Sequence, residues 1–319
     1  METRPIGSLT VSTVGLGCNN FGQRLDYEGT AAVVDAALDA GVDFLDTADI
    51  YGDTKSEQFL GRALRGRRER VVLATKFGMK VAGDEHLKGA RPDYVHRALD
   101  ASLRRLETDR IDLYWLHRPD PETPIADTLA ALDEEVKAGR VREIGCSGFS
   151  AEQLRQASAA VRSEGAARFV AVQNEYSLLH REPEREVLAE CERQGLAFVP
   201  FFPLASGLLT GKYRAGQPPP QGARLSGGNP RFLNDRNLAA AEALRAFAES
   251  RGHTLLELAF SWLLARPQVV SVIAGATKPE QVRANVAAAS WRLTPEELDE
   301  VNRLAPLAPL APDKELVAR

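Results

Sequence analysis

Short apolar runs alternate with longer amphipathic stretches along the whole 319-residue chain. Eight of these runs are rich in Val, Ile, Leu and Phe, and most are apolar on consecutive positions, which is typical of strands buried on both faces. We expect strands at Val14–Leu16, Phe44–Asp46, Val71–Thr75, Ile111–Leu116, Glu143–Cys146, Phe169–Val172, Ala197–Phe201 and Val269–Ile273.

The stretches between these runs carry the start and stop signals of helices. Pro92 opens one stretch at a position where a missing amide costs little, and Gly139 and Gly195 end two others. Ser150 and Gln153 have the spacing of a capping box. Strands that alternate with helices predict an α/β fold, a (β/α)8 TIM barrel. A doubly wound open sheet is the alternative, although no GxGxxG follows an early strand.

Three segments extend this plan. The turn at Gly7 and Ser8 between apolar pieces predicts an N-terminal β-hairpin, which we expect to close the bottom of the barrel. The stretch of about 205–235 contains QPPPQG and SGGNP and predicts a long loop, a length typical of functional lids or disorder. Extra helices are expected near the C-terminus, before a Pro-rich surface tail of about 305–319. We therefore interpret residues 1–319 as one barrel domain.

Composition and charge narrow the function classes. Lys plus Arg number 40 and Asp plus Glu number 44, so the net charge of −4 disfavours a general nucleic-acid binder. Three cysteines without a CxxC pair disfavour a disulfide framework or a zinc site, and no metal site is expected. The chain shows neither a signal-peptide pattern nor a run near the ~18 apolar residues that span a bilayer. These features predict a soluble, cytoplasmic protein without a membrane partner.

Polar residues stand where three successive predicted strands end. The second strand ends at Asp46, with Tyr51 in the loop behind it, and the next two lead to Lys76 and His117. In a closed barrel these strands are neighbours, and the carboxyl end of the strands carries the active site. Each residue alone has an ordinary structural interpretation, but all four in this order predict a catalytic cluster.

These residue types suit the reduction of a carbonyl group. A phenol can protonate the developing alkoxide, but its ordinary pKa of about 10 is high for this work. The ammonium of Lys76 would lower the pKa of Tyr51, Asp46 would keep Lys76 charged, and His117 would orient the substrate oxygen. A Schiff-base aldolase that uses Lys76 is an alternative, disfavoured because a protonated amine is a poor nucleophile.

Several motifs then reveal a resemblance. GVDFLDTADIYGDTKSEQFLGRAL, ATKFG, DLYWLHRP, REIGCSGFS, VQNEYSLL, FFPLASGLLTGKY and IAGATKPEQVRANV resemble the aldo-keto reductase family, in family order, from Gly7 to Leu304. The chain looks most like the bacterial reductases related to potassium-channel β subunits. The resemblance implies a barrel that binds NADPH or NADP, with NADH less favoured, and reduces aldehydes and ketones. It places the catalytic tetrad on Asp46, Tyr51, Lys76 and His117.

The same resemblance implies a set of cofactor-binding residues. It assigns Ser147 and Gln173 to the nicotinamide carboxamide and Phe201 to stacking on the ring. It assigns the pyrophosphate to the loop Pro203, Leu204, Ala205, Ser206, Gly207 and Leu208, with Lys212 as an added charge. It assigns the adenosine end to Gly275, Thr277, Lys278, Gln281 and Asn285, and the nicotinamide ribose to Gly17, Cys18 and Asn19.

Two departures from the family pattern bear on specificity. Gly148 stands where Asn is usual, and Gly275-Ala276 replaces a Lys-Ser pair, so a 2′-phosphate would need Lys278 or Arg283. The loop around residues 214–231 is expected to fold over the cofactor. The substrate, a small carbonyl compound, is expected beside Asn19, Tyr51 and the loops after Lys76 and His117. A nucleotide-sensing regulatory protein with little turnover is the alternative function, and the choice between monomer and homo-oligomer stays open.

Overall fold

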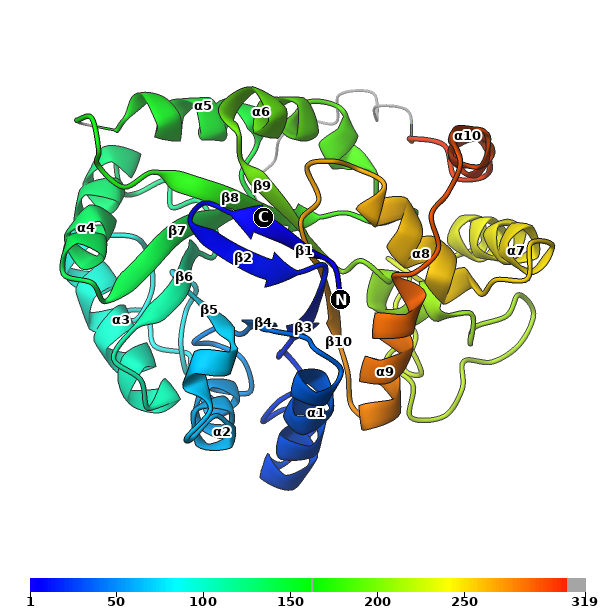
Figure 1. Ribbon diagram of the computed structural model, residues 1–319, viewed down its shortest axis with the longest axis horizontal. Coiled ribbons are helices and arrows are strands. Elements are labelled where there is room, and N and C mark those ends of the chain that lie inside the picture. The colour runs from blue at the N-terminus through cyan, green and yellow to red at the C-terminus, as the bar shows by residue number, and fades with distance from the viewer. Residues whose placement is uncertain (162, 309–319) are drawn as a thin grey trace.

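Eight parallel strands form the centre of the molecule in the computed structural model, which describes residues 1–161 and 163–308 (Figure 1). Their order in the sheet is β10-β3-β4-β5-β6-β7-β8-β9. The strands are β3 (Val14–Gly17), β4 (Phe44–Asp46), β5 (Val72–Phe77), β6 (Ile111–Leu116), β7 (Val141–Ser147), β8 (Phe169–Glu175), β9 (Ala197–Phe201) and β10 (Val272–Gly275). This is the (β/α)8 barrel that the alternation of apolar runs predicts.

The barrel closes between β9 and β10 through few backbone contacts. Phe198 donates its amide to the carbonyl of Gln268 at 2.7 Å, and its carbonyl accepts from Val270 at 3.1 Å. The prediction of a last strand at Val269–Ile273 was therefore wrong in its bounds: β10 spans Val272–Gly275, and Val269 forms only an isolated bridge to Phe198. The continuous ladder is the one that β10 forms with β3, which aligns Val272 with Val14.

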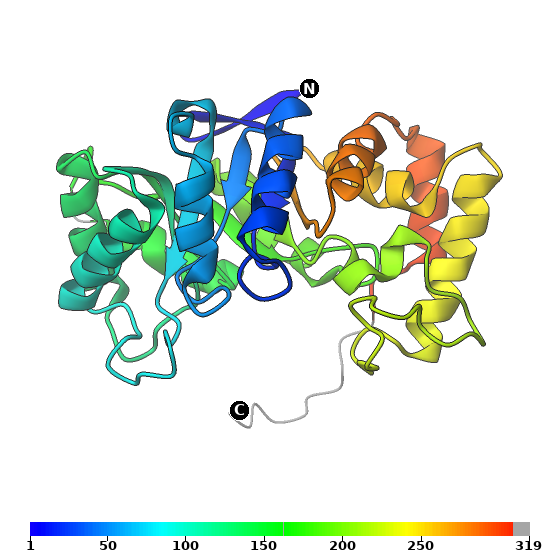
Figure 2. The same ribbon diagram turned by 90° about the horizontal axis from the view of Figure 1, so that it is seen from below.

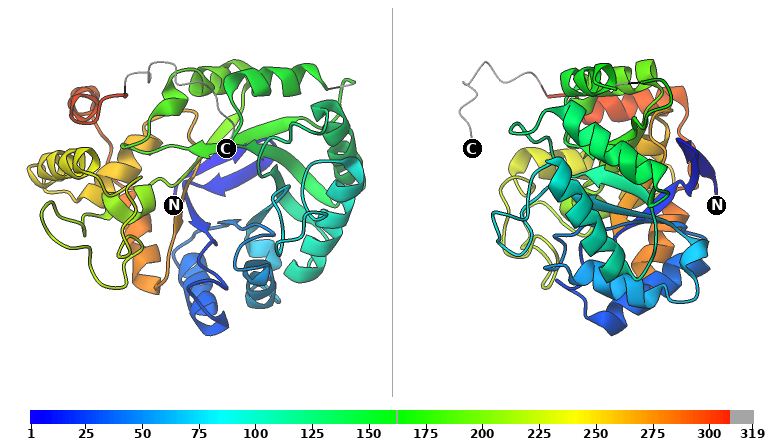
Figure 3. Two further views of the ribbon diagram at one scale, coloured as in Figure 1. Left: turned by 180° about the vertical axis from the view of Figure 1, so that it is seen from behind. Right: turned by 90° about the vertical axis from the view of Figure 1, so that its left-hand side faces the viewer.

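Helices surround the strands, and Figure 3 shows them arranged around the barrel from two further sides. They are α1 (Tyr27–Asp39), α2 (Lys55–Ala63), α3 (Pro92–Leu106), α4 (Ile125–Lys137), α5 (Ala151–Ala159), α6 (Val187–Gln194), α7 (Asp235–Glu249), α8 (Leu255–Leu264), α9 (Pro279–Ala288) and α10 (Pro295–Leu304), with short 3-10 turns η1 (Arg68–Arg70), η2 (Glu182–Glu184) and η3 (Ala205–Thr210). The predicted capping box of Ser150 and Gln153 is confirmed, as is the glycine stop at Gly195. Both signals act locally, so the sequence alone could place these helix ends.

The predicted hairpin is present as β1 (Thr3–Ile6) and β2 (Leu9–Ser12), paired antiparallel. Its side chains Ile6, Leu9 and Val11 are buried against Phe44 and Trp115 inside the barrel. In Figure 1 the hairpin lies across the near end of the strands. It closes the amino-terminal end of the barrel with apolar side chains, as expected.

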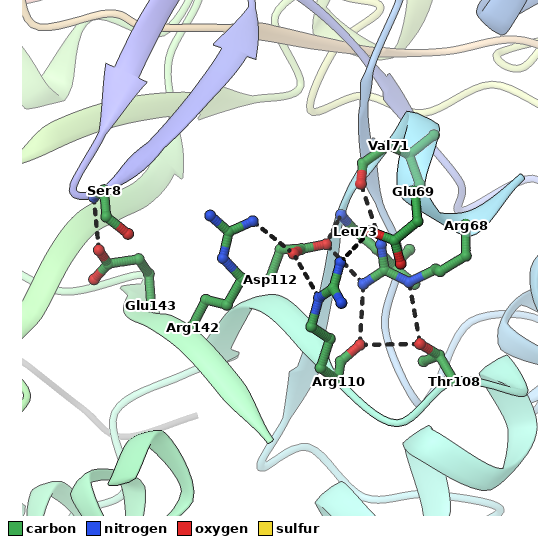
Figure 4. Close-up of polar contacts among 10 residues, drawn as sticks. All are labelled: Ser8, Arg68, Glu69, Val71, Leu73, Thr108, Arg110, Asp112, Arg142 and Glu143. Atoms are coloured by element: carbon green, nitrogen blue, oxygen red, sulfur yellow. Dashed lines mark hydrogen bonds and ion pairs between the residues drawn. The ribbon is translucent and has the colours of Figure 1, made fainter. Parts of the chain in front are cut away.

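A second set of contacts lies beside the hairpin at this amino-terminal end (Figure 4). Asp112 of β6 is 1% exposed and receives Arg68 at 2.7 Å, Arg142 at 3.1 Å and the backbone amide of Leu73 at 2.9 Å. Arg110 is 3.7 Å from the same carboxylate. Three cations therefore compensate one buried carboxylate where β5, β6 and β7 begin.

The loops after the strands gather at the opposite end of the barrel from the hairpin, as Figure 2 shows. The predicted long loop contains the 3-10 turn η3 at its start and has no helix or strand between Thr210 and Asp235. Of the predicted tail, residues 309–319 lie outside the described residues. Within the described part of the chain, no helix has the length and apolar character needed to cross a bilayer.

Candidate active site

A large cavity opens at the carboxyl end of the strands. Its volume is about 880 Å³, which lies in the upper part of the range for ligand pockets, roughly 300–1,000 Å³. Its walls come from the loop after β3, the ends of β4 and β6 to β10, the turn η3, the long loop and helix α9. The cavity is therefore built from the face of the barrel that the sequence predicts to carry the chemistry.

The four predicted catalytic residues meet in this cavity. Lys76 on β5 is fully buried and donates to Asp46 on β4 and, at 2.9 Å, to the carbonyl of Thr47. The ring of Tyr51 lies 5.2 Å from the Lys76 ammonium and packs edge-on against His117, with ring centroids 5.9 Å apart. Asp46, Tyr51 and His117 line the cavity. Lys76 is not part of the cavity wall but lies behind it, against Asp46 and Tyr51.

The neighbouring strands explain this convergence. The sheet places β4 beside β5 and β5 beside β6, with Lys76 opposite Trp115. The amide of His117 continues the ladder by donating to Phe77 at 2.8 Å. In the ladder, Asp46 lies opposite Ala74, two residues before Lys76, so Asp46, Lys76 and His117 leave three neighbouring strands near their carboxyl ends.

Burial modifies the predicted electrostatics of Tyr51. Burial raises the pKa of the Tyr51 hydroxyl, the charge of Lys76 lowers it, and Asp46 raises it, so that the resulting pKa is above its ordinary value. The expected lowering by Lys76 is present but is outweighed by desolvation. For Lys76, burial lowers the pKa, but Asp46 and Tyr51 raise it, and the net shift is upward. The ammonium is therefore held charged, as predicted.

His117 is held neutral. Burial lowers the pKa of His117 well below its usual value, and the charges of Lys76 and Arg118 lower it further. Its Nδ1 atom is buried and has no hydrogen-bond partner among the described residues. A neutral imidazole with an unpartnered nitrogen can still exchange a hydrogen bond with a bound molecule.

The predicted carboxamide residues flank the centre of the cavity. Ser147 at the end of β7 lies opposite Gln173 of β8 in the ladder, and both line the cavity. Gln173 also donates to Asp46 at 3.3 Å, which ties this pair to the predicted tetrad. Gly17, Cys18 and Asn19 line the same region, so these predicted neighbours are brought together.

The turn after β9 has a strained backbone. Ala205, Ser206 and Gly207 have φ values of +45°, +57° and +94°, a run in the left-handed region. Such conformations cost roughly 1–3 kcal/mol for each residue other than glycine and gather at functional sites. Phe201, Pro203, Leu204, Ser206 and Gly207 line the cavity.

Two residues of this predicted loop do not reach the cavity, because Ala205 and Leu208 are buried in the hydrophobic core. Leu208 is fully buried in the hydrophobic core and is absent from the cavity wall. Its side chain is apolar and follows the kink at Gly207, so it turns inward. The position of Leu208 next to small residues in the sequence could not show this.

At the far end of the cavity, Gly275, Thr277, Gln281 and Asn285 form the wall. Gln281 accepts the amide of Thr277 at 2.7 Å, which fixes the turn into α9. A Cβ at Gly275 would lie 3.1 Å from side-chain atoms of both Asn19 and Asn20, so a larger residue there would have to displace these side chains slightly.

The two cations predicted for a 2′-phosphate are not in the cavity wall. Lys278 is exposed at the start of α9, and the side chain of Arg283 is 63% exposed and 4.0 Å from Glu280. Instead, the cavity holds Lys212, as predicted, together with Arg24 and Arg224. Sequence analysis missed these two arginines because each comes from an irregular loop.

These three cations form one group. Burial lowers the pKa of Lys212, and the charges of Arg24 and Arg224 lower it further. Arg24 donates to the carbonyl of Gly222 at 2.9 Å, which joins the loop after β3 to the long loop. Within residues 1–161 and 163–308, none of the three forms an ion pair with a carboxylate. The group therefore offers uncompensated positive charge to a ligand.

A further polar side chain went unnoticed in the sequence. Asp49, two residues before Tyr51, is 1% exposed, and neither of its carboxylate oxygens has a hydrogen-bond partner among the described residues. Burial raises the pKa of Asp49 well above its usual value, as does the charge of Glu57. Asp49 follows Asp46 in an ordinary turn sequence, so no pattern signals its burial.

Comparison with known proteins agrees with this geometry. The model of the aldo/keto reductase family matches residues 13–306. The chain belongs to the aldo/keto reductase family. As a member of this family it is an oxidoreductase, and the resemblance seen in the sequence motifs is confirmed.

Relatives of this aldo/keto reductase come from plants and bacteria. It is 32% identical to a probable aldo-keto reductase 1 of Glycine max, over 94% of this chain and 87% of the relative. It is 32% identical to a probable voltage-gated potassium channel subunit beta of Arabidopsis thaliana, over 98% and 99% of the two chains. Aldo-keto reductase AKR11C1 from Bacillus halodurans, solved in its holo form, superposes with a TM-score of 0.82 at 32% identity, over 97% of each chain.

Proposed function

We propose that this aldo/keto reductase is an NADPH-dependent enzyme that reduces aldehydes and ketones to alcohols. The observation that carries the proposal is the meeting of Asp46, Tyr51, Lys76 and His117 in one large cavity. Their residue types match the needs of carbonyl reduction, which requires a proton donor, a cation that stabilises the resulting phenolate and a group that orients the substrate oxygen.

The cavity fits a dinucleotide phosphate in shape and charge. Ser147 and Gln173 would hold the carboxamide, Phe201 would stack on the ring, and the left-handed turn around Ser206 would approach the pyrophosphate. Consecutive backbone amides in such turns form concavities that bind anions. When bound, NADPH supplies the hydride.

The number of cations supports NADPH over NADH. Arg24, Lys212 and Arg224 lie in the cavity wall without carboxylate partners among the described residues. The two charges of a pyrophosphate would leave one cation uncompensated, and a 2′-phosphate would use it. We therefore propose that Arg24 of the loop after β3 and Arg224 of the long loop, and not Lys278 and Arg283, bind this phosphate. The Arg24 contact with Gly222 supports the proposal that part of the long loop would lie over the cofactor.

The protein's own residues would manage the proton. Tyr51 would donate its phenolic proton to the carbonyl oxygen as that oxygen gains negative charge. Lys76, held charged by Asp46, would stabilise the phenolate that remains. His117 is neutral, so it would donate a hydrogen bond to the substrate oxygen without competing as an acid.

Binding and turnover measured together test this function. NADPH and NADH are titrated against the intrinsic tryptophan fluorescence, and NADPH consumption is then followed with benzaldehyde and methyl 4-formylbenzoate. We expect tighter binding of NADPH than of NADH, and turnover of both aldehydes. A protein that binds neither nucleotide would contradict the proposal.

A second candidate is a nucleotide-sensing regulatory protein. It is favoured by the similarity to a relative named as a probable potassium channel subunit beta. Tight NADPH binding without turnover of any aldehyde would support this alternative. The complete predicted tetrad favours catalysis.

A further inference from the structure

Arg118 is a cation of the cavity that the cofactor assignment does not use. It directly follows His117 in the loop between β6 and α4, and it lines the cavity. Among residues 1–161 and 163–308, its guanidinium has neither a hydrogen-bond acceptor nor a carboxylate partner. By contrast, the arginines at the other end of the barrel, Arg68 and Arg142, both pair with Asp112. Arg118 is therefore free to bind an anion.

The position of Arg118 separates it from the phosphate end. The residues assigned to the pyrophosphate and the adenosine follow β9 and β10, whereas Arg118 and Met79 follow β6 and β5. In the sheet order, β3 and β4 separate β5 from β10, and β7 and β8 separate β6 from β9. Asp46 and Tyr51, which come from the β4 end, lie between the two groups of strands on the first of these sides. The cavity thus has a second cationic end next to the reacting centre.

Arg118 also lies close to the reacting groups. After burial and Lys76, its charge is the third influence that lowers the pKa of His117. A molecule bound with its carbonyl at Tyr51 and His117 would extend toward this guanidinium and toward Met79 and Pro119, which line the cavity beside it.

We propose that this end of the cavity binds the carboxylate of a substrate that carries both a carbonyl group and a carboxylate, with Arg118 as the specificity-determining residue. The proposal rests on the proposed reductase function and names its substrate class. A planar guanidinium binds a carboxylate through two parallel hydrogen bonds. The single charge of one guanidinium balances the single charge of a carboxylate.

The preference for a carboxylate substrate must come from local charge. The protein as a whole has a net charge of −4, which does not attract anions at long range. The group assigned to the phosphates would be neutralised by the cofactor, so Arg118 would be the cation left for the substrate. Because the site is open to solvent, added salt should weaken the preference.

The experiment compares an acid with its neutral ester. Steady-state kinetics with NADPH are measured for 4-carboxybenzaldehyde and methyl 4-formylbenzoate, and for 4-oxobutanoate and its methyl ester. Arg118→Met is compared with the unchanged protein, and Arg118→Lys tests whether charge alone suffices. Arg97→Gln serves as the matched control, since it removes one charge from an exposed position on α3 outside the cavity.

We expect kcat/KM to favour at least one acid over its ester by roughly tenfold or more, as for a charge-assisted hydrogen bond. Arg118→Met should reduce this ratio by a similar factor, mainly through KM, Arg118→Lys should restore part of it, and Arg97→Gln should leave it unchanged. The dissociation constant of benzoate, measured by calorimetry with NADP present, should rise in parallel in Arg118→Met. Benzoate has the anion without a reducible carbonyl, so this readout is independent of turnover.

The outcomes separate the two proposals. If NADPH is bound and the esters are turned over, but the acids are not preferred, the carboxylate site is wrong and the reductase function stands. Equal losses for acid and ester in Arg118→Met would also overturn the carboxylate site. If NADPH is neither bound nor consumed, the proposed function fails, and the substrate class fails with it.

Discussion

The two ends of the barrel each bury a carboxylate, but they compensate it in different ways. At the amino-terminal end, Asp112 is surrounded by three arginines and the Leu73 amide, as Figure 4 shows. At the carboxyl end, Asp46 pairs with one fully buried lysine. The first carboxylate has more cations than it needs, whereas the second shares its only cation with Tyr51.

This difference separates stability from function. Around the carboxyl end, His117 and Asp49 keep buried polar atoms without partners among the described residues, and Ser206 has a strained backbone. An unsatisfied polar atom or a strained residue costs stability, so such features persist where a bound molecule or a reaction uses them. At the other end the buried Nε of Arg110 also has no hydrogen-bond partner among the described residues, but it lies 3.7 Å from the Asp112 carboxylate, and the apolar hairpin supplies contacts that need no ligand.

The largest effect should come from removing the proposed proton donor. Tyr51→Phe deletes only the phenolic oxygen, and general acid catalysis typically contributes about 10²–10⁴-fold. We therefore expect kcat to fall by about this factor, with the NADPH dissociation constant and the thermal unfolding midpoint little changed. Single-turnover kinetics measure the loss of the chemical step, and fluorescence titration measures the NADPH dissociation constant.

Tyr114→Phe is the matched control for this change. Tyr114 lies on β6, is fully buried outside the cavity wall, and its hydroxyl has no partner among the described residues. Its removal should leave kcat unchanged, and stability should not fall. If Tyr51→Phe loses no more activity than Tyr114→Phe, Tyr51 is not the acid.

At the amino-terminal end we expect the opposite result, a loss of stability with little change in kcat. Asp112→Asn leaves Arg68 without its charge partner inside the protein, where unpaired buried charges cost about 3–5 kcal/mol. Since the three guanidinium groups are partly exposed, we expect a smaller loss of unfolding free energy, about 2–3 kcal/mol. Urea denaturation measures this loss, and kcat of the folded enzyme should be unchanged.

Arg142→Gln tests how much a single arginine contributes to the compensation of Asp112. The side chain of Arg142 is 44% exposed, so its ion pair with Asp112 should contribute less than about 1 kcal/mol. A loss as large as that of Asp112→Asn would show that the arginines do not compensate for one another. A fall in kcat in either variant would mean that the two ends are coupled.

The sequence predicted the fold and the spatial meeting of the four candidate residues because both follow from order along the chain. Consecutive buried runs define parallel strands, and strands that are successive in the sequence are adjacent in the barrel. Asp46, Lys76 and His117 therefore had to emerge side by side. The capping box at Ser150 was equally legible, since all its contacts lie within four residues.

The sequence was insufficient where residues far apart in the chain come into contact, and where burial determines the pKa of a side chain. Arg24 and Arg224 are 200 residues apart and enter one cavity only because two irregular loops meet over it. The direction of the Tyr51 pKa shift depends on how fully the ring is desolvated, which residue spacing does not reveal. Asp49 is two residues before Tyr51 in the sequence, yet nothing local marks it as buried.

Asp49 supplies the last test of the contrast between the two ends, through the pH dependence of stability. Since the pKa of Asp49 is raised in the folded state, folding favours its protonated form. This contribution is complete below the unfolded pKa of about 3.9 and is lost as the pH rises toward the folded pKa. Asp49→Asn cannot titrate, so it should become more stable relative to the unchanged protein as the pH rises from about 4.5 to about 8. Urea unfolding across this range checks the sign, and a stability difference that is constant with pH would mean that Asp49 is ionised and solvated like an ordinary surface carboxylate.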